Sequence, residues 1–136
     1  MSAATGAGQA GAGAAVAEAI ATALRGRAEL AGVALFDGGA GVLPRIEIAE
    51  PQGADWSAKD FCGRELRTAV TVRVGEGQRG RMAALIGAVE AAGESLGGDI
   101  AGWRVVSALF LRTRGAVERG GHAALIEHRV RVMRIN

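Results

Sequence analysis

The stretch that decides the fold is the C-terminal quarter of the chain, which contains WRVVSALFLRTR (103–114) and HAALIEHRVRVMRIN (122–136). In the second segment, apolar residues and one histidine alternate with charged residues: Ile126, His128, Val130 and Val132 against Glu127, Arg129 and Arg131. A period of two is typical of an antiparallel strand with one buried and one solvated face. The polar, glycine-rich segment GAVERGG (115–121) separates the two, so we predict a long β-hairpin with its turn there.

The composition indicates one globular domain. The chain has 136 residues, 49% of them hydrophobic, and a chain of this length buries about two thirds of its unfolded surface. Its 16 basic residues are all arginine except Lys59. Residues 1–63 carry 4 basic and 7 acidic groups (net −3), whereas residues 64–136 carry 12 and 7 (net +5). This asymmetry fits either head-to-tail contact between identical copies or arginine-rich sheet faces that are simply solvated.

The sequence shows no sign of export or membrane insertion. Cys62 is the sole cysteine, which excludes an internal disulfide and fits a reducing bacterial cytoplasm as the place of synthesis. Apolar stretches such as AAVAEAIATAL are too short and too interrupted to span a bilayer, so no membrane partner is expected. Residues 1–13 lack the basic start and apolar stretch of a secretory signal, and we interpret them as a flexible N-terminal arm.

The remaining periodicities predict two helices and further strands. The helices are expected at 14–25, with Gly26 as C-cap, and at 78–96, before Gly97-Gly98. Strands are expected at three places: 33–36, 45–50 and, most clearly, 64–74. The main elements follow the order α-β-β-α-β-β. We therefore predict an α+β fold for residues 14–136, with a four-stranded, mostly antiparallel sheet and two helices packed on one face.

Few residues in this sequence suggest chemistry. His122 and His128 lack Cys or Asp partners at metal-ligand spacing, so we interpret His128 as a buried strand histidine with one satisfied hydrogen bond. Cys62 has no visible base and is expected to be a small, partly buried loop residue. GEGQRG (75–80) and DGGAG (37–41) lack the lysine of a P-loop and the spacing of a dinucleotide-binding loop, and a strand-to-helix turn explains GEGQRG. The sequence predicts no catalytic, cofactor-binding or metal site.

Two aromatic residues lie in the polar connection between the second and third predicted strands, residues 51–63. Trp56 and Phe61 are two of only five aromatics in the chain. Burial of an aromatic side chain is worth about 1.5–3 kcal/mol, so both are expected to be covered. Either the connection folds back over the open end of the core, or it docks on a neighbouring molecule, where aromatic anchors are common.

Arginines concentrate on the final hairpin. We place three of them at its tip, Arg112, Arg114 and Arg119, and three on its return strand, Arg129, Arg131 and Arg134. A nucleic-acid surface would add exposed aromatics for stacking, but the chain has no tyrosine, and Phe110 is expected to belong to the core. A solvated sheet face or a subunit contact is therefore favoured over readout of DNA.

The order of elements, together with four segments, resembles the tail terminator (tail completion) proteins of long-tailed bacteriophages, prophages and the gene transfer agents of alphaproteobacteria. The segments are PRIEIAE (44–50), DWSAK (55–59), RELRTAVTVRV (64–74) and RVRVMRIN (129–136). The resemblance covers residues 14–136. Members often carry an aromatic residue after the leading proline, where this chain has Arg45. The alanine- and arginine-rich composition suits a gene transfer agent.

The resemblance implies a structural virion protein at the head-proximal end of the tail, without catalysis or cofactor. Such a protein assembles with itself into a ring, usually a hexamer, on the finished tail tube. The ring stops polymerisation of the tail tube protein and provides the joint to the head–tail connector, or stopper, protein. DNA passes through the lumen without specific binding.

Three surfaces are expected to carry this assembly. The 51–63 connection would contact a neighbour or the tube, the hairpin tip at 112–121 would protrude, and outward arginines would pair with the next subunit or line the channel. The residues concerned are Trp56, Phe61, Arg67, Arg73, Arg112, Arg114, Arg119, Arg129 and Arg131. The alternatives are a head-completion or stopper protein, a small enzyme or ligand-binding domain that uses GEGQRG, and a nucleic-acid-binding module on the arginine-rich face.

Overall fold

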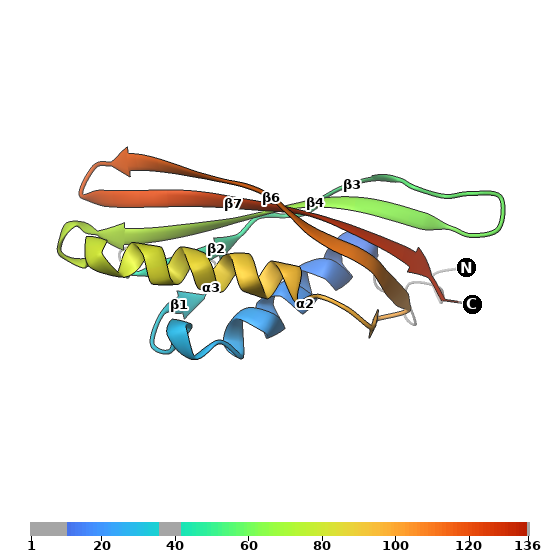
Figure 1. The fold of residues 1–136 in the computed structure, drawn as a ribbon, viewed down its shortest axis with the longest axis horizontal. Coiled ribbons are helices and arrows are strands. Elements are labelled where there is room, and N and C mark those ends of the chain that lie inside the picture. Colours follow the sequence, from blue (N-terminus) through green and yellow to red (C-terminus); the bar gives the residue numbers. More distant parts are fainter. Residues whose placement is uncertain (1–10, 36–41, 136) are drawn as a thin grey trace.

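The computed structural model describes residues 11–35 and 42–135, which form two α-helices on one face of a seven-stranded sheet (Figure 1). The helices are α2 (Ala12–Arg25) and α3 (Met82–Glu94), with short 3-10 turns η1 (Ala28–Leu30) and η2 (Glu76–Arg81). The strands are β1 (Ala34–Leu35), β2 (Arg45–Ile48), β3 (Gln52–Asp55), β4 (Gly63–Gly75), β5 (Asp99–Ile100), β6 (Trp103–Glu118) and β7 (Gly121–Arg134). The α+β class and the two helices on one face agree with the sequence prediction.

Three long antiparallel strands form the centre of the sheet, whose order is β1-β2-β4-β7-β6-β5 with β3 beside β4. The predicted hairpin is confirmed as β6 and β7, but its turn is much shorter than 115–121. Pairing continues until Glu118 lies opposite Gly121, so only Arg119 and Gly120 connect the strands. Gly120 has φ +80°, a conformation that favours glycine.

The prediction of four strands was too low. The strand predicted at 33–36 is confirmed as β1 and adds two residues to the sheet, and the two strands that were not predicted are also short: β5 contains two residues and β3 contains four. β3 lies within the region predicted as a plain connection, where all four of its residues are exposed. Backbone pairing with β4 holds this edge strand, and its sequence QGAD has no apolar alternation that would reveal it.

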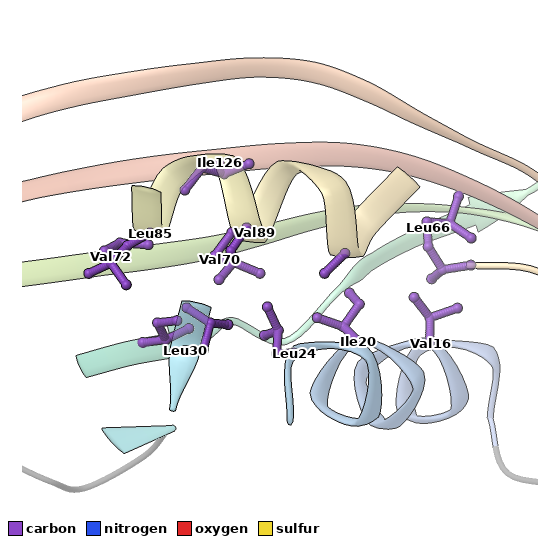
Figure 2. Close-up of a cluster of buried hydrophobic side chains, with 14 of the residues drawn as sticks. Val16, Ile20, Leu24, Leu30, Leu66, Val70, Val72, Leu85, Val89 and Ile126 are labelled. Carbon is purple, nitrogen blue, oxygen red and sulfur yellow. The ribbon is translucent and has the colours of Figure 1, made fainter. Parts of the chain in front are cut away.

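The core lies between the two helices and the inner face of the sheet. Val16, Ile20 and Leu24 of α2 point toward the strands, as predicted from their spacing (Figure 2). They meet a layer of buried side chains from β4, β7 and α3: Leu66, Val70, Val72, Ile126, Leu85 and Val89 (Figure 2). Burial of these apolar stripes holds the helices on one face of the sheet.

The helix boundaries differ slightly from the prediction. α2 begins at Ala12, where the amide of Ala15 donates to the carbonyl of Gly11 at 2.9 Å, so residues 12–13 are not part of an arm. The second predicted helix divides into η2 and α3, because the side chain of Gln78 accepts a bond from the amide of Gly75 at 2.9 Å and tightens the first turn. Residues 1–10 and the DGGAG segment (37–41) lie outside the described residues.

His128 is buried, as predicted, with 2% of its surface exposed. Its Nε2 lies 3.1 Å from the carbonyl oxygen of Glu90 on α3, and its ring fits against the bare Cα of Gly93. Phe110 lies opposite His128 on β6, but it is 39% exposed, so its assignment to the core was wrong. β6 is near the edge of the sheet and its register shifts between Phe110 and Arg112, which leaves this ring only partly covered.

Candidate functional site

No described helix covers the face of the sheet opposite α2 and α3 (Figure 1). This face carries arginine–glutamate pairs. Most pairs join side chains on the same strand or on neighbouring strands, and the pair Arg73–Glu118 reaches from β4 across β7 to β6. The pairs are Arg45–Glu47 at 2.7 Å, Arg73–Glu47 at 3.2 Å, Arg112–Glu127 at 2.6 Å, Arg131–Glu65 at 2.9 Å, and Arg73–Glu118. We call this surface the open face.

Three of the predicted interface arginines, Arg73, Arg112 and Arg131, are already partnered within the chain. Arg73 lies between Glu47 and Glu118, and these two carboxylates raise the pKa of its guanidinium further. Arg131 binds Glu65, and its guanidinium carbon lies 5.1 Å from the centre of the Trp56 ring. These arginines stabilise the sheet of a single copy, whether or not they also face a neighbour.

Arg67 and Arg129, also predicted interface residues, are in a different situation. They lie directly opposite each other on β4 and β7, and neither forms an ion pair with any described residue. The Nε of Arg129 is buried and has no hydrogen-bond partner within residues 11–35 and 42–135. Like charges directly opposite each other on a sheet are unfavourable, so these two guanidinium groups repel each other without a carboxylate between them.

Glu127 is a member of this site that the sequence pattern did not single out. It points to the open face, yet only 8% of its surface is exposed, because arginine side chains cover it. The hydrogen bond from Arg112 lowers the pKa of Glu127, and the charges of Arg114 and Arg67 act in the same direction. Arg112 and Arg114 lie within the paired part of β6 and not at the tip, where only Arg119 and Gly120 connect the strands.

The 51–63 region forms a hairpin arm made of β3, a short loop and the start of β4. Trp56 and Phe61 pack against each other with ring centres 5.3 Å apart, and both are half-buried. Since Trp56 also lies beside Arg131 of the same chain, the structure favours the interpretation in which this loop folds back on its own sheet. Contact with a neighbour remains a prediction.

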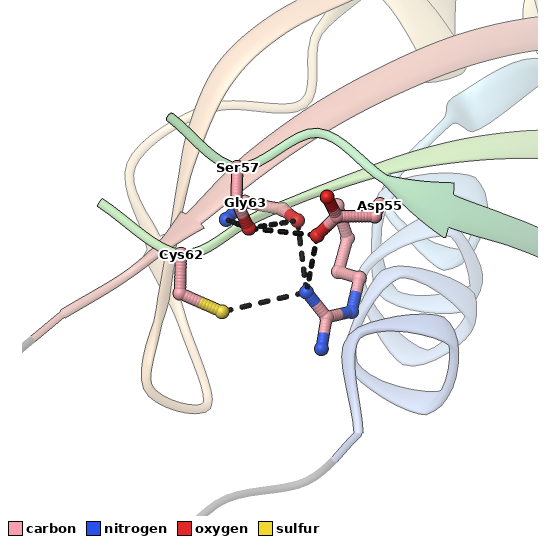
Figure 3. Close-up of polar contacts among 5 residues, drawn as sticks. Asp55, Ser57, Cys62 and Gly63 are labelled. Atoms are coloured by element: carbon pink, nitrogen blue, oxygen red, sulfur yellow. Dashed lines mark hydrogen bonds and ion pairs between the residues drawn. The ribbon is translucent and has the colours of Figure 1, made fainter. Parts of the chain in front are cut away.

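A polar network holds the base of this arm (Figure 3). The hydroxyl of Ser57 donates to Asp55 at 2.7 Å and accepts from the amide of Gly63 at 3.0 Å. The bond from Ser57 lowers the pKa of Asp55. The guanidinium of Arg64 reaches the Gly63 carbonyl at 2.9 Å and the Cys62 sulfur at 3.4 Å. Cys62 is partly buried, as predicted, and serves this network.

The outer edge of β6 is a further exposed feature. β5 pairs only with Trp103 and Arg104, and beyond Val105 no described strand borders β6 on this side. Exposed apolar side chains accompany it: Val106, Leu109, Phe110 and Val117, the last 81% exposed. An unpaired, partly apolar edge of this length is a natural surface for another chain.

The other chemical candidates do not converge. Cys62 precedes the first residue of β4, His122 lies opposite Val74 near its last residue, and His128 lies opposite Thr68. In the described part of the chain, no three His, Cys, Asp or Glu side chains gather as a metal site would require. GEGQRG is the predicted strand-to-helix turn, closed by Gln78, which also donates to the carbonyl of Leu43 at 2.9 Å. Within residues 11–35 and 42–135 no helix is long and apolar enough to cross a membrane.

Comparison with known proteins gives one informative result. No protein-family model and no curated protein matches the chain. Among solved structures, a chain from the "Virion of native gene transfer agent (GTA) particle" superposes with a TM-score of 0.78. The match is 22% identical and covers 91% of this chain and 99% of the other. The two chains share a fold.

Proposed function

We propose that this protein is a structural component of a phage-like particle, and specifically its tail terminator. The observation that carries the proposal is the end-to-end match to a chain of a gene transfer agent virion, which spans nearly all of both chains. The sequence independently resembles tail terminators through segments such as PRIEIAE (44–50) and RVRVMRIN (129–136). The proposed location is therefore the head-proximal end of the tail in a virion or phage-like particle.

In this proposal the protein acts through its shape. Copies form a ring on the end of the tail tube, and the family resemblance implies six copies. The free β6 edge, the open face and the arm formed by residues 52–63 are the surfaces offered for contact. Contacts between different surfaces of identical copies either close into a ring or continue as a filament. A closed ring ends tube growth and offers its other side to the head connector, while DNA passes through the lumen.

The test is to delete the gene from the particle-producing strain and to examine the particles by electron microscopy. We expect tubes of irregular or excessive length that are not joined to heads, and restoration of normal particles by a plasmid copy of the gene. Tails of normal length joined to heads in the deletion strain would refute the proposal.

A head-completion or stopper protein is the second candidate, because the structural match is to a chain of a virion particle, to which a connector protein would also belong. Purified protein should bind isolated tail tubes if it is a terminator. Binding to the portal side of tail-less heads, without binding to tubes, would assign it to the connector instead.

A further inference from the structure

We infer that Arg67 and Arg129 form a binding site for the carboxylates of Glu18 and Glu50 from a second copy of this chain. This inference rests on the proposed ring assembly and assigns the residues of its subunit contact. The argument is carried by the unpaired arginines on one surface and the exposed carboxylates on another.

The open face has more arginines than carboxylates to pair with them. Following the strand register, the face carries these arginines: Arg45, Arg67, Arg73, Arg104, Arg112, Arg114, Arg129 and Arg131. Its carboxylates are Glu47, Glu65, Asp99, Glu118 and Glu127, and every one of them is in an ion pair. Arg67, Arg114 and Arg129 remain without a carboxylate among the described residues. We call these three the arginine patch.

Arg129 shows that the patch is more than solvated surface. Its Nε is inaccessible to water and lacks a hydrogen-bond partner among the described residues, although buried donors in folded proteins are nearly always satisfied. Arg67 is its direct cross-strand neighbour, so the two guanidinium groups repel each other in an isolated copy. A carboxylate placed between them would accept hydrogen bonds from both guanidinium groups and remove the repulsion.

Another surface of the same chain offers such carboxylates. Glu18 and Glu50 line one groove, which runs along α2 as far as Arg25 and is bordered on its other side by residues 48–50. The side chain of Glu18 is 76% exposed and has only a long contact of 3.8 Å to Arg25. Glu50 is exposed and forms no ion pair with a described residue. The groove belongs to the acidic part of the chain, where residues 1–63 have a net charge of −3.

The open face fits a protein partner better than DNA. Five of its eight arginines are already neutralised by neighbouring carboxylates, whereas DNA binding draws on a track of free cations, one for each phosphate contacted. Around the patch lie small or apolar side chains, such as Ala69 and Leu125. Arginine among apolar residues, without lysine, is typical of protein–protein interfaces.

The patch and the groove lie on different surfaces, so their contact is head-to-tail. This permits a sharp test with two charge-reversed chains, Arg67→Glu/Arg129→Glu and Glu18→Arg/Glu50→Arg. In the first chain both surfaces are acidic, and in the second both are basic, so neither chain should bind itself. In an equimolar mixture each surface meets its opposite, and association should return, with the two chains alternating.

Association is measured by sedimentation velocity and native mass spectrometry over a concentration series into the millimolar range. We expect each reversed chain to self-associate at least tenfold more weakly than wild type, and the mixture to regain wild-type association. The matched control, Arg79→Glu/Arg81→Glu, has the same charge change at exposed positions in η2 and should behave as wild type. Circular dichroism of every chain checks that the fold is retained.

A mixture that remains monomeric overturns the inference, as does an Arg67→Glu/Arg129→Glu chain that associates like wild type. If that chain loses binding to a double-stranded DNA oligonucleotide and the mixture does not regain self-association, the patch binds phosphate instead. These results are independent of tail length in the deletion strain, so failure of the contact and failure of the proposed function are distinguishable.

Discussion

A close approach between α3 and the His128 ring predicts a large effect of a single methyl group at Gly93. A Cβ at this position of α3 would lie 2.3 Å from Cε1 and Nε2 of the His128 ring. The ring cannot move away easily, because it is 2% exposed, bonded to the Glu90 carbonyl and flanked by Phe110 at 5.8 Å between ring centres. The variant Gly93→Ala should therefore destabilise the fold.

The magnitude follows from three contributions to the free energy of unfolding. Overpacking of a well-filled core costs about 1–3 kcal/mol, and loss of the bond from His128 to Glu90 costs about 1 kcal/mol. Replacement of glycine by alanine in a helix returns up to about 1 kcal/mol. The net expectation is a loss of roughly 1–3 kcal/mol, measured by urea unfolding followed by circular dichroism.

Gly87 provides the matched control in the same helix. It is exposed and a Cβ there would meet nothing within 4 Å, so Gly87→Ala should stabilise the protein by about 0.5–1 kcal/mol. In a His128→Ala background the obstacle at Gly93 is gone, and Gly93→Ala should then behave like Gly87→Ala. If Gly93→Ala is as stable as Gly87→Ala in the wild-type background, the proposed packing of His128 on α3 is wrong.

Three further predictions concern the open face and the arm. The pKa values of Glu47 and Glu127 are lowered in the folded state. Their contribution to stability is therefore complete above the ordinary glutamate pKa of about 4.3 and is lost as the pH falls through the lowered values. Urea unfolding between pH 7 and pH 3 checks this, and Glu127→Gln should make the free energy of unfolding depend less on pH. Arg112→Ala should lower the free energy of unfolding by about 1 kcal/mol, because it leaves the covered Glu127 unpaired, whereas Arg104→Ala removes a fully exposed pair and should have little effect on the urea midpoint. If the arm docks on the tail tube, Trp56→Ala should leave the monomer folded but abolish its binding to tail tubes. Unchanged binding to tail tubes would show that the arm is not part of the interface.

The main strands could be predicted from the sequence because their periodicity reflects burial directly. β4 alternates buried side chains at 66, 68, 70, 72 and 74 with more exposed ones between them, β7 alternates from Ile126 to Val132, and one face of each strand packs on the helices. Ile46 on β2 follows the same rule and is completely buried. Where one face of a strand meets the core and the other meets water, the alternation in sequence and the alternation in structure are the same property.

The edge elements could not be predicted, since their stability comes from the backbone of a neighbour. β3 has no buried side chain and exists because residues 64–67 of β4 present free backbone groups. The same limit explains Phe110, whose inward position on β6 was predicted to imply burial. A bulge next to it and the lack of a further long strand leave it exposed. The alternation in a strand predicts the face to which a side chain points, but the side chain is buried only where another element packs on that face.

The candidate site shows a further limit, because ion pairs depend on register. The sequence marked Arg67, Arg73, Arg129 and Arg131 as equivalent outward arginines, yet the structure satisfies two of them internally and leaves two opposite each other. Charge patterns on single strands do not contain this information. It arises only when β4 and β7 are aligned, and one strand's residues acquire specific partners.

The observed register is informative, because a slip of two residues would pair the charges better. It would keep every side chain on its present face, and it would place Arg129 opposite Glu65 and Glu127 opposite Arg67. Two close contacts oppose the slip. Gly121 lies so close to the Val74 carbonyl that a Cβ would be 2.0 Å from its oxygen, and His128 fills the space beside Gly93. Packing thus sets the register, and this register leaves the arginine patch without ion-pair partners in a single copy. The repulsion between the facing arginines lowers the stability of the isolated protein. A carboxylate from a second copy removes this repulsion only upon assembly.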